Sequence, residues 1–158
     1  MQRIMFVCHG NICRSPMAEF VLRDLAMKAG RANEFRIASS ATSAEEVGNP
    51  VHPGTRRMLA AHGIDCVGKK ARQLRRDEYR SWDLFVAMDD ENLRCLSRIL
   101  GKDPDRKVHK LLEFATPEVF GTAVRDVADP WYTGDFAATW RDVLDGCTAL
   151  LEMLTNKK

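Results

Sequence analysis

Residues 3–16 read RIMFVCHGNICRSP and contain the clearest structural signals in the chain. Residues 3–7 are apolar and rich in strand-forming side chains, which predicts a buried strand. A glycine–asparagine pair ends that pattern and favours a tight turn. Ser15 followed by Pro16 is typical of a helix start, with Ser15 as the N-cap and Pro16 at the first helical position. The stretch therefore predicts a strand, a short loop and a helix in immediate succession.

The same alternation continues along the chain. Further strands are predicted at residues 35–39, 84–87 and 108–112. Helices are predicted from Ser15 to Gly30 and at residues 55–62, 75–81, 90–100 and 136–154, with loops at residues 40–54 and 115–134. Because strands that alternate with helices form parallel sheets covered on both faces, we predict an α/β fold with helices on both sides of a parallel sheet.

Composition narrows the range of functions. The chain has 158 residues, a length that favours one domain spanning residues 1–158. Lys and Arg total 24 against 22 Asp and Glu, and this formal net charge of +2 argues against a dedicated nucleic-acid-binding protein. The longest apolar runs have five residues, whereas a membrane span needs about 20. The N-terminus has no apolar stretch of signal-peptide length, so we expect a cytoplasmic protein without a nucleic-acid or membrane partner.

The five cysteines have neither the pattern of a disulfide framework nor that of a zinc site. An odd number in a chain of this length argues against a secreted disulfide scaffold, and the paired spacings of zinc ligands are absent. Cys66, Cys95 and Cys147 have no neighbours that suggest chemistry, and Cys147 lies on the apolar stripe of a predicted helix. We therefore expect no metal site, and the candidates for chemistry are Cys8 and Cys13.

Cys8 and Arg14 frame the first loop in a C-x5-R-S pattern. Backbone N–H groups of a glycine-containing loop at a helix N-terminus form a nest for an anion, and the helix end adds partial positive charge. In that nest the Arg14 fork suits two oxygens of a phosphate, and the positive surroundings favour a Cys8 thiolate. Ser15 can donate a hydrogen bond to the same sulfur. The pattern predicts a phosphate-binding loop after strand one that contains its own nucleophile.

A thiolate that takes a phosphoryl group also needs a proton donor for the leaving oxygen. Asp129 is the candidate, because it lies in an irregular segment before the last predicted helix and is followed by Pro130, which stiffens a turn. Trp131 and Tyr132 could wall a pocket and partly exclude water. Taken alone, this segment is an aspartate–proline turn with two packing aromatic residues. Only the presence of the Cys8 loop favours the catalytic interpretation.

The sequences CHGNICRSP at residues 8–16 and DPWY at residues 129–132 resemble the low-molecular-weight protein tyrosine phosphatase family. The resemblance extends over nearly the whole chain and includes VGNP at residues 47–50, HGI at 62–64, ARQ at 71–73 and AMD at 87–89 with Asn92. It implies a three-layer α/β fold with a four-stranded parallel sheet and flanking helices, in agreement with the alternation described above. It also implies a cysteine-dependent phosphomonoester hydrolase that removes phosphate from protein phosphotyrosine and from aryl phosphates.

The resemblance further implies a role for each residue of the two motifs. Cys8 attacks phosphorus and forms a phosphocysteine intermediate, Arg14 and the loop amides stabilise the transition state, and Asp129 acts first as acid and then as base. Asn11 holds the loop, and Ser15 stabilises the Cys8 thiolate. The residues implied in binding the phosphate or the substrate are His9, Gly10, Asn11, Ile12, Cys13, Ser15, Glu45, Trp131 and Tyr132. The implied enzyme needs no metal or other cofactor, acts on phosphorylated proteins, and is a monomer or weak homodimer.

Cys13 matches a second loop cysteine of the family. In the family this residue can form a reversible disulfide with the nucleophile and protect it from over-oxidation. We therefore expect an enzyme that peroxide inactivates and a thiol restores.

Three positions depart from the usual family pattern and bear on substrate preference rather than on the reaction. His9 stands where relatives often carry an apolar residue, and it either contacts substrate or faces solvent. Glu45, or its neighbour Glu46, stands where many relatives place an aromatic wall. A carboxylate there would repel anionic substrates and remove a stacking surface. Lys69 replaces a histidine that often supports Asn11.

Three other functions compete with this interpretation. A thiol-linked arsenate reductase shares the fold and the loop but needs a further cysteine pair near residues 80–90, where this chain has none, and Cys95 stands alone. Protein arginine phosphatases resemble the chain more closely, but they tend to carry threonine where this chain has Ile12. A bulky apolar residue there favours a phenolic ester over a guanidinium. A phosphate-binding module without catalysis is disfavoured by the joint presence of a nucleophile, an arginine and an acid.

Overall fold

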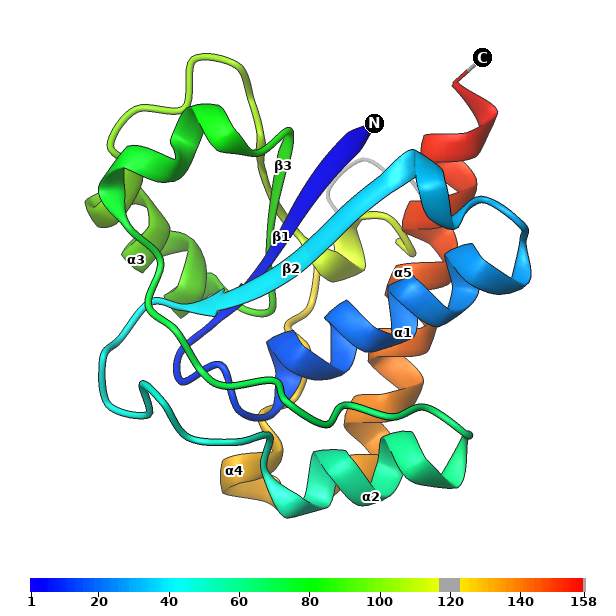
Figure 1. Ribbon diagram of the computed structural model, residues 1–158. Coiled ribbons are helices and arrows are strands. Elements are labelled where there is room, and N and C mark those ends of the chain that lie inside the picture. Colours follow the sequence, from blue (N-terminus) through cyan, green and yellow to red (C-terminus); the bar gives the residue numbers. More distant parts are fainter. Residues whose placement is uncertain (117–122, 158) are drawn as a thin grey trace.

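The computed structural model describes residues 1–116 and 123–157. Within this part of the chain, the centre is a four-stranded sheet in which all neighbouring strands are parallel, in the order β2-β1-β3-β4 (Figure 1). The strands are β1 (Gln2–Cys8), β2 (Phe35–Ala41), β3 (Leu84–Ala87) and β4 (Val108–Lys110). The predicted three-layer α/β fold with a four-stranded parallel sheet is confirmed.

Helices connect the strands and cover both faces of the sheet. They are α1 (Arg14–Lys28), α2 (Pro53–Ala61), α3 (Asp90–Leu100), α4 (Pro130–Thr133) and α5 (Phe136–Asn156), with the 3-10 turns η1 (Ala32–Glu34), η2 (Arg76–Ser81) and η3 (Leu111–Glu113). Ile4 and Phe6 of β1 belong to the core on the side of α1 and α5, whereas Met5 and Val7 face the side of α3 and η2 (Figure 1). Burial on both faces explains why β1 is a continuous apolar run.

The carboxyl ends of the strands meet at one edge of the sheet, because all four strands are parallel. The last residues of the strands are Cys8, Ala41, Ala87 and Lys110. Side chains that follow these residues come close together although they are far apart in the sequence. In open α/β sheets, ligands bind outside this edge.

The first helix begins differently from the prediction. α1 starts at Arg14, Cys13 occupies the N-cap position, and no side chain caps the helix there. The prediction that Ser15 caps the helix is therefore wrong. Ser15 lies in the first turn with no exposed surface, and its hydroxyl faces the Cys8 sulfur. Its contacts with neighbouring side chains outweigh its local preference for a cap.

Other boundaries differ where the predicted elements were short. The predicted helix at residues 75–81 is the 3-10 turn η2, and β4 is shorter than predicted because η3 begins at Leu111. The predicted loop at residues 115–134 contains the helix α4, and its residues 117–122 lie outside the described part. Tertiary packing decides short segments such as these, since their intrinsic propensities are weak.

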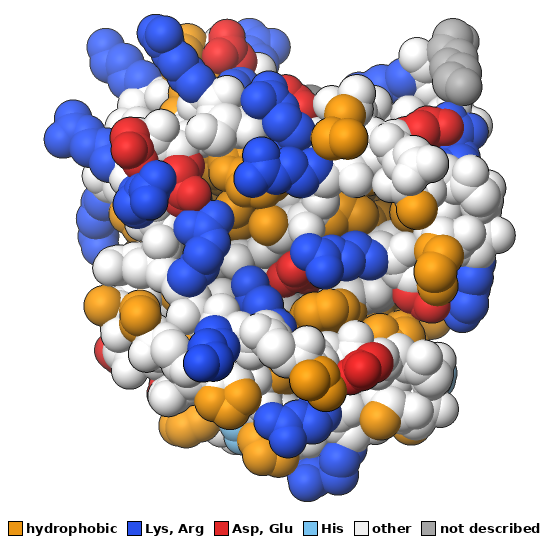
Figure 2. Space-filling view, in the orientation of Figure 1, with side chains coloured by type: hydrophobic (Ala, Val, Ile, Leu, Met, Phe, Trp, Pro, Cys, Tyr) orange, Lys and Arg blue, Asp and Glu red, His pale blue; other side chains and the backbone are white. Residues whose placement is uncertain are grey.

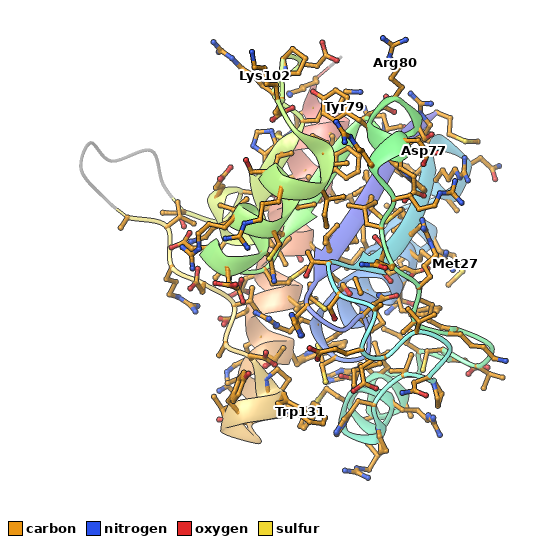
Figure 3. The ribbon with its side chains drawn as sticks, turned by 90° about the vertical axis from the view of Figure 1, so that its left-hand side faces the viewer. Met27, Asp77, Tyr79, Arg80, Lys102 and Trp131 are labelled. Atoms are coloured by element: carbon orange, nitrogen blue, oxygen red, sulfur yellow. The ribbon has the colours of Figure 1, made fainter. Side chains whose placement is uncertain are left out.

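Figures 2 and 3 show how side chains are distributed over the molecule. Figure 2 shows Lys and Arg side chains gathered on the side of α3, with hydrophobic side chains in small separate groups. In Figure 3, Trp131 lies at one end of the molecule, and Tyr79, Arg80 and Lys102 lie at the other. None of the helices in the described residues combines the length and the hydrophobicity that crossing a membrane requires.

Candidate active site

The loop after β1 is held from outside through its carbonyl groups. The carbonyls in and beside the loop accept hydrogen bonds from residues 42–55: Cys8 O from Thr42 N (2.9 Å), His9 O from Ser43 N (3.1 Å), Ile12 O from His52 N (2.9 Å) and Cys13 O from Thr55 Oγ1 (3.1 Å). A trans peptide places a carbonyl and the following N–H on opposite sides. The amides that follow these carbonyls therefore point to the inner side of the loop, as an anion nest requires.

Asn11 fixes the shape of the loop from behind. It is buried and adopts a left-handed backbone conformation with φ of 59°, which asparagine tolerates better than most residues. Its amide nitrogen donates to the hydroxyls of Ser15 (2.8 Å) and Ser39 (2.9 Å), and its oxygen accepts from the Arg72 amide (3.2 Å). Asn11 thus ties the loop to α1, to β2 and to the segment around Arg72.

A buried ion pair supports this network. The Ser39 hydroxyl donates to Glu19, and Lys69 Nζ lies 3.3 Å from the same carboxylate and donates to the Ser39 carbonyl (2.9 Å). Burial lowers the pKa of Lys69, while the Glu19 carboxylate opposes that shift. Lys69 therefore supports Asn11 through Ser39 and Glu19, not through a hydrogen bond of its own to Asn11.

Cys8 lies at the floor of the loop. Its sulfur is 3.0 Å from the Ser15 hydroxyl oxygen. That oxygen already accepts a hydrogen bond from Asn11, so the Ser15 proton is free for donation to the sulfur. The arrangement supplies a hydrogen bond to a thiolate at Cys8.

Cys13 is the second cysteine of the loop. Burial, the neighbouring Cys8 and the charge of Asp129 raise the pKa of Cys13 to about 12, and Arg14 opposes this only in part. Cys13 is therefore a protonated thiol at neutral pH. Of the two loop cysteines, this leaves Cys8 as the candidate nucleophile.

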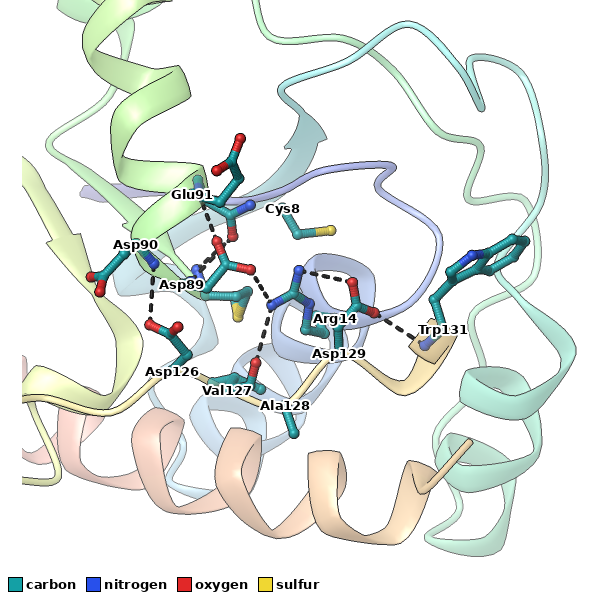
Figure 4. Close-up of polar contacts among 12 residues, drawn as sticks. Cys8, Arg14, Asp89, Asp90, Glu91, Asp126, Val127, Ala128, Asp129 and Trp131 are labelled. Atoms are coloured by element: carbon teal, nitrogen blue, oxygen red, sulfur yellow. Dashed lines mark hydrogen bonds and ion pairs between the residues drawn. The ribbon is translucent and has the colours of Figure 1, made fainter. Parts of the chain in front are cut away.

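Arg14 is buried beneath the loop and held by acceptors from two segments, the end of β3 and the residues before α4. Its Nη1 donates to Asp89 Oδ2 (2.7 Å) and to the Val127 carbonyl (3.0 Å), and its Nη2 donates to Asp129 Oδ2 (3.3 Å), as Figure 4 shows. Burial opposes its charge, but Cys8 and the carboxylates of Asp129 and Asp89 outweigh burial and raise the pKa of Arg14. A guanidinium has more N–H donors than these acceptors use, so Arg14 keeps donors for an anion.

Asp89 and Asp129 each cap a helix and contact Arg14 at the same time. Asp89 caps α3, because its Oδ1 accepts a hydrogen bond from the backbone N–H of Asn92 (2.7 Å) while its Oδ2 faces Arg14. Asp129 caps α4, because its Oδ1 accepts from the Trp131 amide (3.1 Å) while Oδ2 faces Arg14. The helix starts therefore orient both carboxylates.

These elements surround a cavity of about 420 Å³. Its lining residues are Cys8, His9, Gly10, Ile12, Cys13, Arg14, Glu45, Glu46, Asp89, Glu91, Asn92, Asp129, Trp131 and Tyr132. The structure thus brings together every site residue that the sequence predicts, except Asn11 and Ser15. Those two lie behind the loop and hold each other and Cys8.

The mouth of the cavity is acidic. His9 Nε2 lies 2.9 Å from Glu45 Oε2, and both side chains are more than half exposed, at 51% and 68%. His9 therefore both faces solvent and lines the cavity. Glu46 lies against Gly10, and Glu91 contributes a third carboxylate from α3.

The two aromatic residues of α4 form an open wall. Trp131 is 60% exposed and Tyr132 is 84% exposed, and both line the cavity. Trp131 makes an edge-on ring contact with His52, with 6.0 Å between the ring centroids. An exposed aromatic wall can take the ring of a substrate.

Sequence reasoning missed three lining residues that follow β3: Asp89, Glu91 and Asn92. A signal for them was present, because β3 lies beside β1 and side chains at its carboxyl end face the same edge. The Val127 carbonyl had no such signal, since any residue type supplies a backbone oxygen.

The positive charge of the site comes from the protein itself. In residues 1–116 and 123–157, no group of three or more His, Cys, Asp or Glu side chains is arranged to hold a metal ion. Arg14 and the inward amides face the cavity, beside the N-terminus of α1. This arrangement can bind a tetrahedral oxyanion directly above a thiol.

The chain matches known proteins over almost its full length. Residues 3–158 match the family model described as low molecular weight phosphotyrosine protein phosphatase. The low molecular weight protein-tyrosine-phosphatase YfkJ of Bacillus subtilis is 37% identical over 158 residues, which cover 100% of this chain and 99% of that protein. The low molecular weight phosphotyrosine protein phosphatase of Gallus gallus is 36% identical over 155 residues, which cover 96% and 95%. The crystal structure of YfkJ matches with a TM-score of 0.91 over 100% of this chain and 97% of that one, at 37% identity.

Proposed function

Since the chain belongs to the low-molecular-weight phosphotyrosine protein phosphatase family, we propose that Cys8, Arg14 and Asp129 carry out its reaction. The enzyme is a cysteine-dependent phosphoric monoester hydrolase that removes phosphate from phosphotyrosine in proteins. One observation carries the assignment of residues: a thiol, a guanidinium and a carboxylate from distant positions line one cavity.

In the first step, the Cys8 sulfur attacks phosphorus in line with the leaving oxygen. The S–P bond forms, the P–O bond to the phenol breaks, and Asp129 transfers a proton to the phenolate oxygen. The Ser15 hydroxyl supports the role of Cys8, because it lies 3.0 Å from the sulfur and can hydrogen-bond to the thiolate before attack. The cap contact with Trp131 supports the role of Asp129, because it orients the carboxylate at the cavity wall.

Arg14 and the loop amides stabilise the phosphoryl oxygens during this transfer. Negative charge in the transition state lies on the non-bridging oxygens, and donors that already point at them need no reorganisation. Asp89 and the Val127 carbonyl hold the Arg14 guanidinium in its orientation, which supports this role.

In the second step, water hydrolyses the phosphocysteine. Asp129 accepts a proton from the water as the new P–O bond forms, and the S–P bond breaks. Inorganic phosphate leaves, and the Cys8 thiolate is restored.

Substitution of the two reacting residues tests this assignment. Cys8→Ser should abolish hydrolysis of p-nitrophenyl phosphate and of a phosphotyrosine peptide, and Asp129→Ala should lower kcat by about 10²- to 10⁴-fold. Acid quenching followed by mass spectrometry should find phosphate on Cys8 in the active protein. Cys66→Ser, which alters a buried thiol outside the cavity, is the matched control and should retain activity. A Cys8→Ser protein with normal activity would falsify the mechanism.

The cavity favours an aryl ester over phosphoarginine. Ile12 lines it together with Trp131 and Tyr132, and this apolar, aromatic lining suits a phenyl ring. Peptides of one sequence that carry either phosphotyrosine or phosphoarginine distinguish the two substrates, and a preference for phosphoarginine would assign the arginine phosphatase activity. Arsenate reduction coupled to thioredoxin would instead assign the redox activity, for which the sequence offers only the isolated Cys95 on α3.

We further propose that residues 1–158 work as one domain in the cytoplasm, as a monomer or weak homodimer, without a metal, nucleic-acid or membrane partner. All five cysteines are free thiols, which supports a reducing compartment. Light scattering after size-exclusion chromatography, at several protein concentrations, tests the oligomeric state. Activity that survives a chelator would support independence from metal, and its loss would contradict it.

A further inference from the structure

Lys110 is a buried lysine outside the catalytic cavity. Its side chain is 5% exposed, and its Nζ donates to the Val124 carbonyl (2.7 Å), to Asp126 Oδ1 (2.8 Å) and to Asp90 Oδ1 (2.9 Å). These acceptors match the donor capacity of an ammonium group. Full pairing offsets the cost of taking the charge out of water, and it fixes the side chain in one position.

The acceptors come from separate parts of the chain. Lys110 is the last residue of β4, Asp90 is the first residue of α3, and Val124 and Asp126 belong to residues 123–129. Asp126 Oδ1 also accepts a hydrogen bond from the Asp90 amide (3.1 Å), which Figure 4 shows. Lys110, Asp90, Val124 and Asp126 therefore form a clamp that joins three segments; we call it the Lys110 clamp.

The clamp leads directly to the proposed acid. Residues 123–129 form neither a helix nor a strand. The Val127 amide donates to the Met88 carbonyl (2.8 Å), Thr139 donates to the Ala128 carbonyl (3.0 Å), and the Lys110 clamp holds the residues before them. Val127, next after Asp126, places its carbonyl on Arg14 at 3.0 Å, and Asp129 follows as the cap of α4. The chain from Asp126 to Asp129 spans roughly 10 Å at most. The anchoring of Asp126 therefore contributes to the position of Asp129.

The charge of Lys110 keeps Asp90 and Asp126 together. Burial opposes this charge, but the hydrogen bonds with Asp126 and Asp90 outweigh burial and raise the pKa of Lys110. Without the ammonium group, Asp90 and Asp126 would face each other as like charges. Their side chains are 61% and 47% exposed, so water can solvate them once they separate. Loss of the Lys110 ammonium group should therefore let residues 124–126 move, and it should leave no charged side chain buried without a partner.

We propose that Lys110 is a positioning residue for the general acid, because its ammonium group anchors residues 124–126 and so places Asp129 at the leaving oxygen. The inference rests on the proposed role of Asp129. Lys110 does not line the cavity, so it acts on the site only through the segments that it joins. Cys8 and its loop keep their own contacts with α1 and residues 42–55.

Two aryl phosphates separate proton transfer from the rest of the reaction. Phenyl phosphate has a leaving group that needs the proton, whereas the nitro group of p-nitrophenyl phosphate stabilises the phenolate without it. Lys110→Met should lower kcat/KM, which reports the steps up to phosphocysteine formation, more on phenyl phosphate than on p-nitrophenyl phosphate. The further factor should be about 10 to 100, as expected for a displaced catalytic group. The double variant Lys110→Met/Asp129→Ala should be no slower than Asp129→Ala alone.

Lys107→Met is the matched control. The Lys107 side chain is 15% exposed, and its Nζ donates to the Tyr79 carbonyl (3.0 Å), at the end of the molecule away from Trp131 in Figure 3. This variant should change kcat/KM on both substrates by the same factor, whatever its effect on the melting temperature. Asp126→Asn weakens the clamp from its other side and should show the selective loss to a smaller degree.

Equal losses on the two substrates in Lys110→Met, or losses that add in the double variant, overturn the proposal. If Lys110→Met does not fold, Asp126→Asn decides by the same comparison. The Asp129→Ala variant separates the role of Asp129 from the role of Lys110. If that variant shows no difference between the substrates, the role of Asp129 fails and the role of Lys110 fails with it. If it shows the difference and the clamp variants do not, only the role of Lys110 fails.

Discussion

The guanidinium of Arg14 lies 3.3 Å from the carboxylate of Asp129, although 115 positions separate the two residues in the chain. Arg14 is the first residue of α1, and Asp129 is the N-cap of α4. This ion pair therefore joins the phosphate-binding loop to the segment that holds the proposed acid. Asp89 holds the same guanidinium from α3, at 2.7 Å. Arg14 is therefore oriented by two carboxylates before any substrate binds.

Arg14→Lys tests this orientation. Lysine keeps the charge, but it cannot contact Asp89, Val127 and Asp129 while presenting a planar pair of donors. We expect kcat on p-nitrophenyl phosphate to fall by about 10²- to 10³-fold, the loss typical of removing a donor to a transition-state oxyanion. Inhibition by inorganic phosphate should weaken in parallel. The melting temperature of the same preparation is the control for folding, and activity close to wild type would contradict the assignment.

The raised pKa of Cys13 predicts how oxidative protection depends on pH. When peroxide converts Cys8 to a sulfenic acid, the Cys13 thiolate attacks that sulfur, the S–O bond breaks, and the disulfide forms with release of hydroxide, which solvent protonates to water. Because burial raises the pKa of Cys13, the thiolate fraction and the rate of disulfide formation should increase steadily with pH in the neutral range. Activity recovered with dithiothreitol after a peroxide pulse measures this. Cys13→Ser should recover less than wild type and Cys66→Ser should recover fully; equal recovery in both would exclude the protective role.

The acidic mouth of the cavity predicts a preference among phosphotyrosine sites. Glu45, Glu46 and Glu91 line it, so basic residues beside the phosphotyrosine should be attracted and acidic ones repelled. We expect basic flanks to raise kcat/KM by about two- to fivefold, the scale of exposed charge pairs, and salt to reduce the difference. Phosphotyrosine peptides that differ only in lysine or glutamate flanks measure this difference in kcat/KM. Glu91→Gln should make the difference smaller. A higher kcat/KM for the glutamate peptide would show that the acidic mouth does not select peptides with basic flanks.

The pair His109 and Glu113 predicts a pH-dependent contribution to stability. The hydrogen bond with Glu113, 2.9 Å long, raises the pKa of His109 above 6.5. Burial by itself would raise the pKa of Glu113, but the hydrogen bond with His109 outweighs burial and lowers this pKa below 4.5. The His109 contribution is complete below pH 6.5 and is lost as pH rises through its folded pKa. The Glu113 contribution is complete above pH 4.5 and is lost as pH falls through its folded pKa.

Urea unfolding of wild type and His109→Gln at a series of pH values measures this contribution. The difference in the free energy of unfolding should be largest between pH 4.5 and 6.5. It should reach about 0.2–1 kcal/mol there, as for other partly exposed ion pairs, and shrink on both sides. A difference that stays constant with pH would show that the pair does not titrate as described.

Local patterns explain why much of the fold and the loop could be predicted. β1 and the loop occupy consecutive residues, so the strand signal, the glycine and the cysteine–arginine spacing are visible together. The same local reasoning failed for Ser15, because a hydroxyl at a helix start also serves a neighbouring sulfur, and only the contact with Cys8 shows which role it has. Asp89 was missed as a site residue for a related reason: its partner Arg14 lies on another element.

The alternation of strands and helices and the loop that contains Cys8 could be predicted, since these depend on residue types within a few positions of each other. The contacts of Asp89 and Asp129 with Arg14, and of Lys110 with the segment before Asp129, are visible in the folded chain alone. They arise because the parallel sheet brings the carboxyl ends of all its strands to one edge. Contacts made there join residues from separate elements, and no periodicity or spacing along the chain records them.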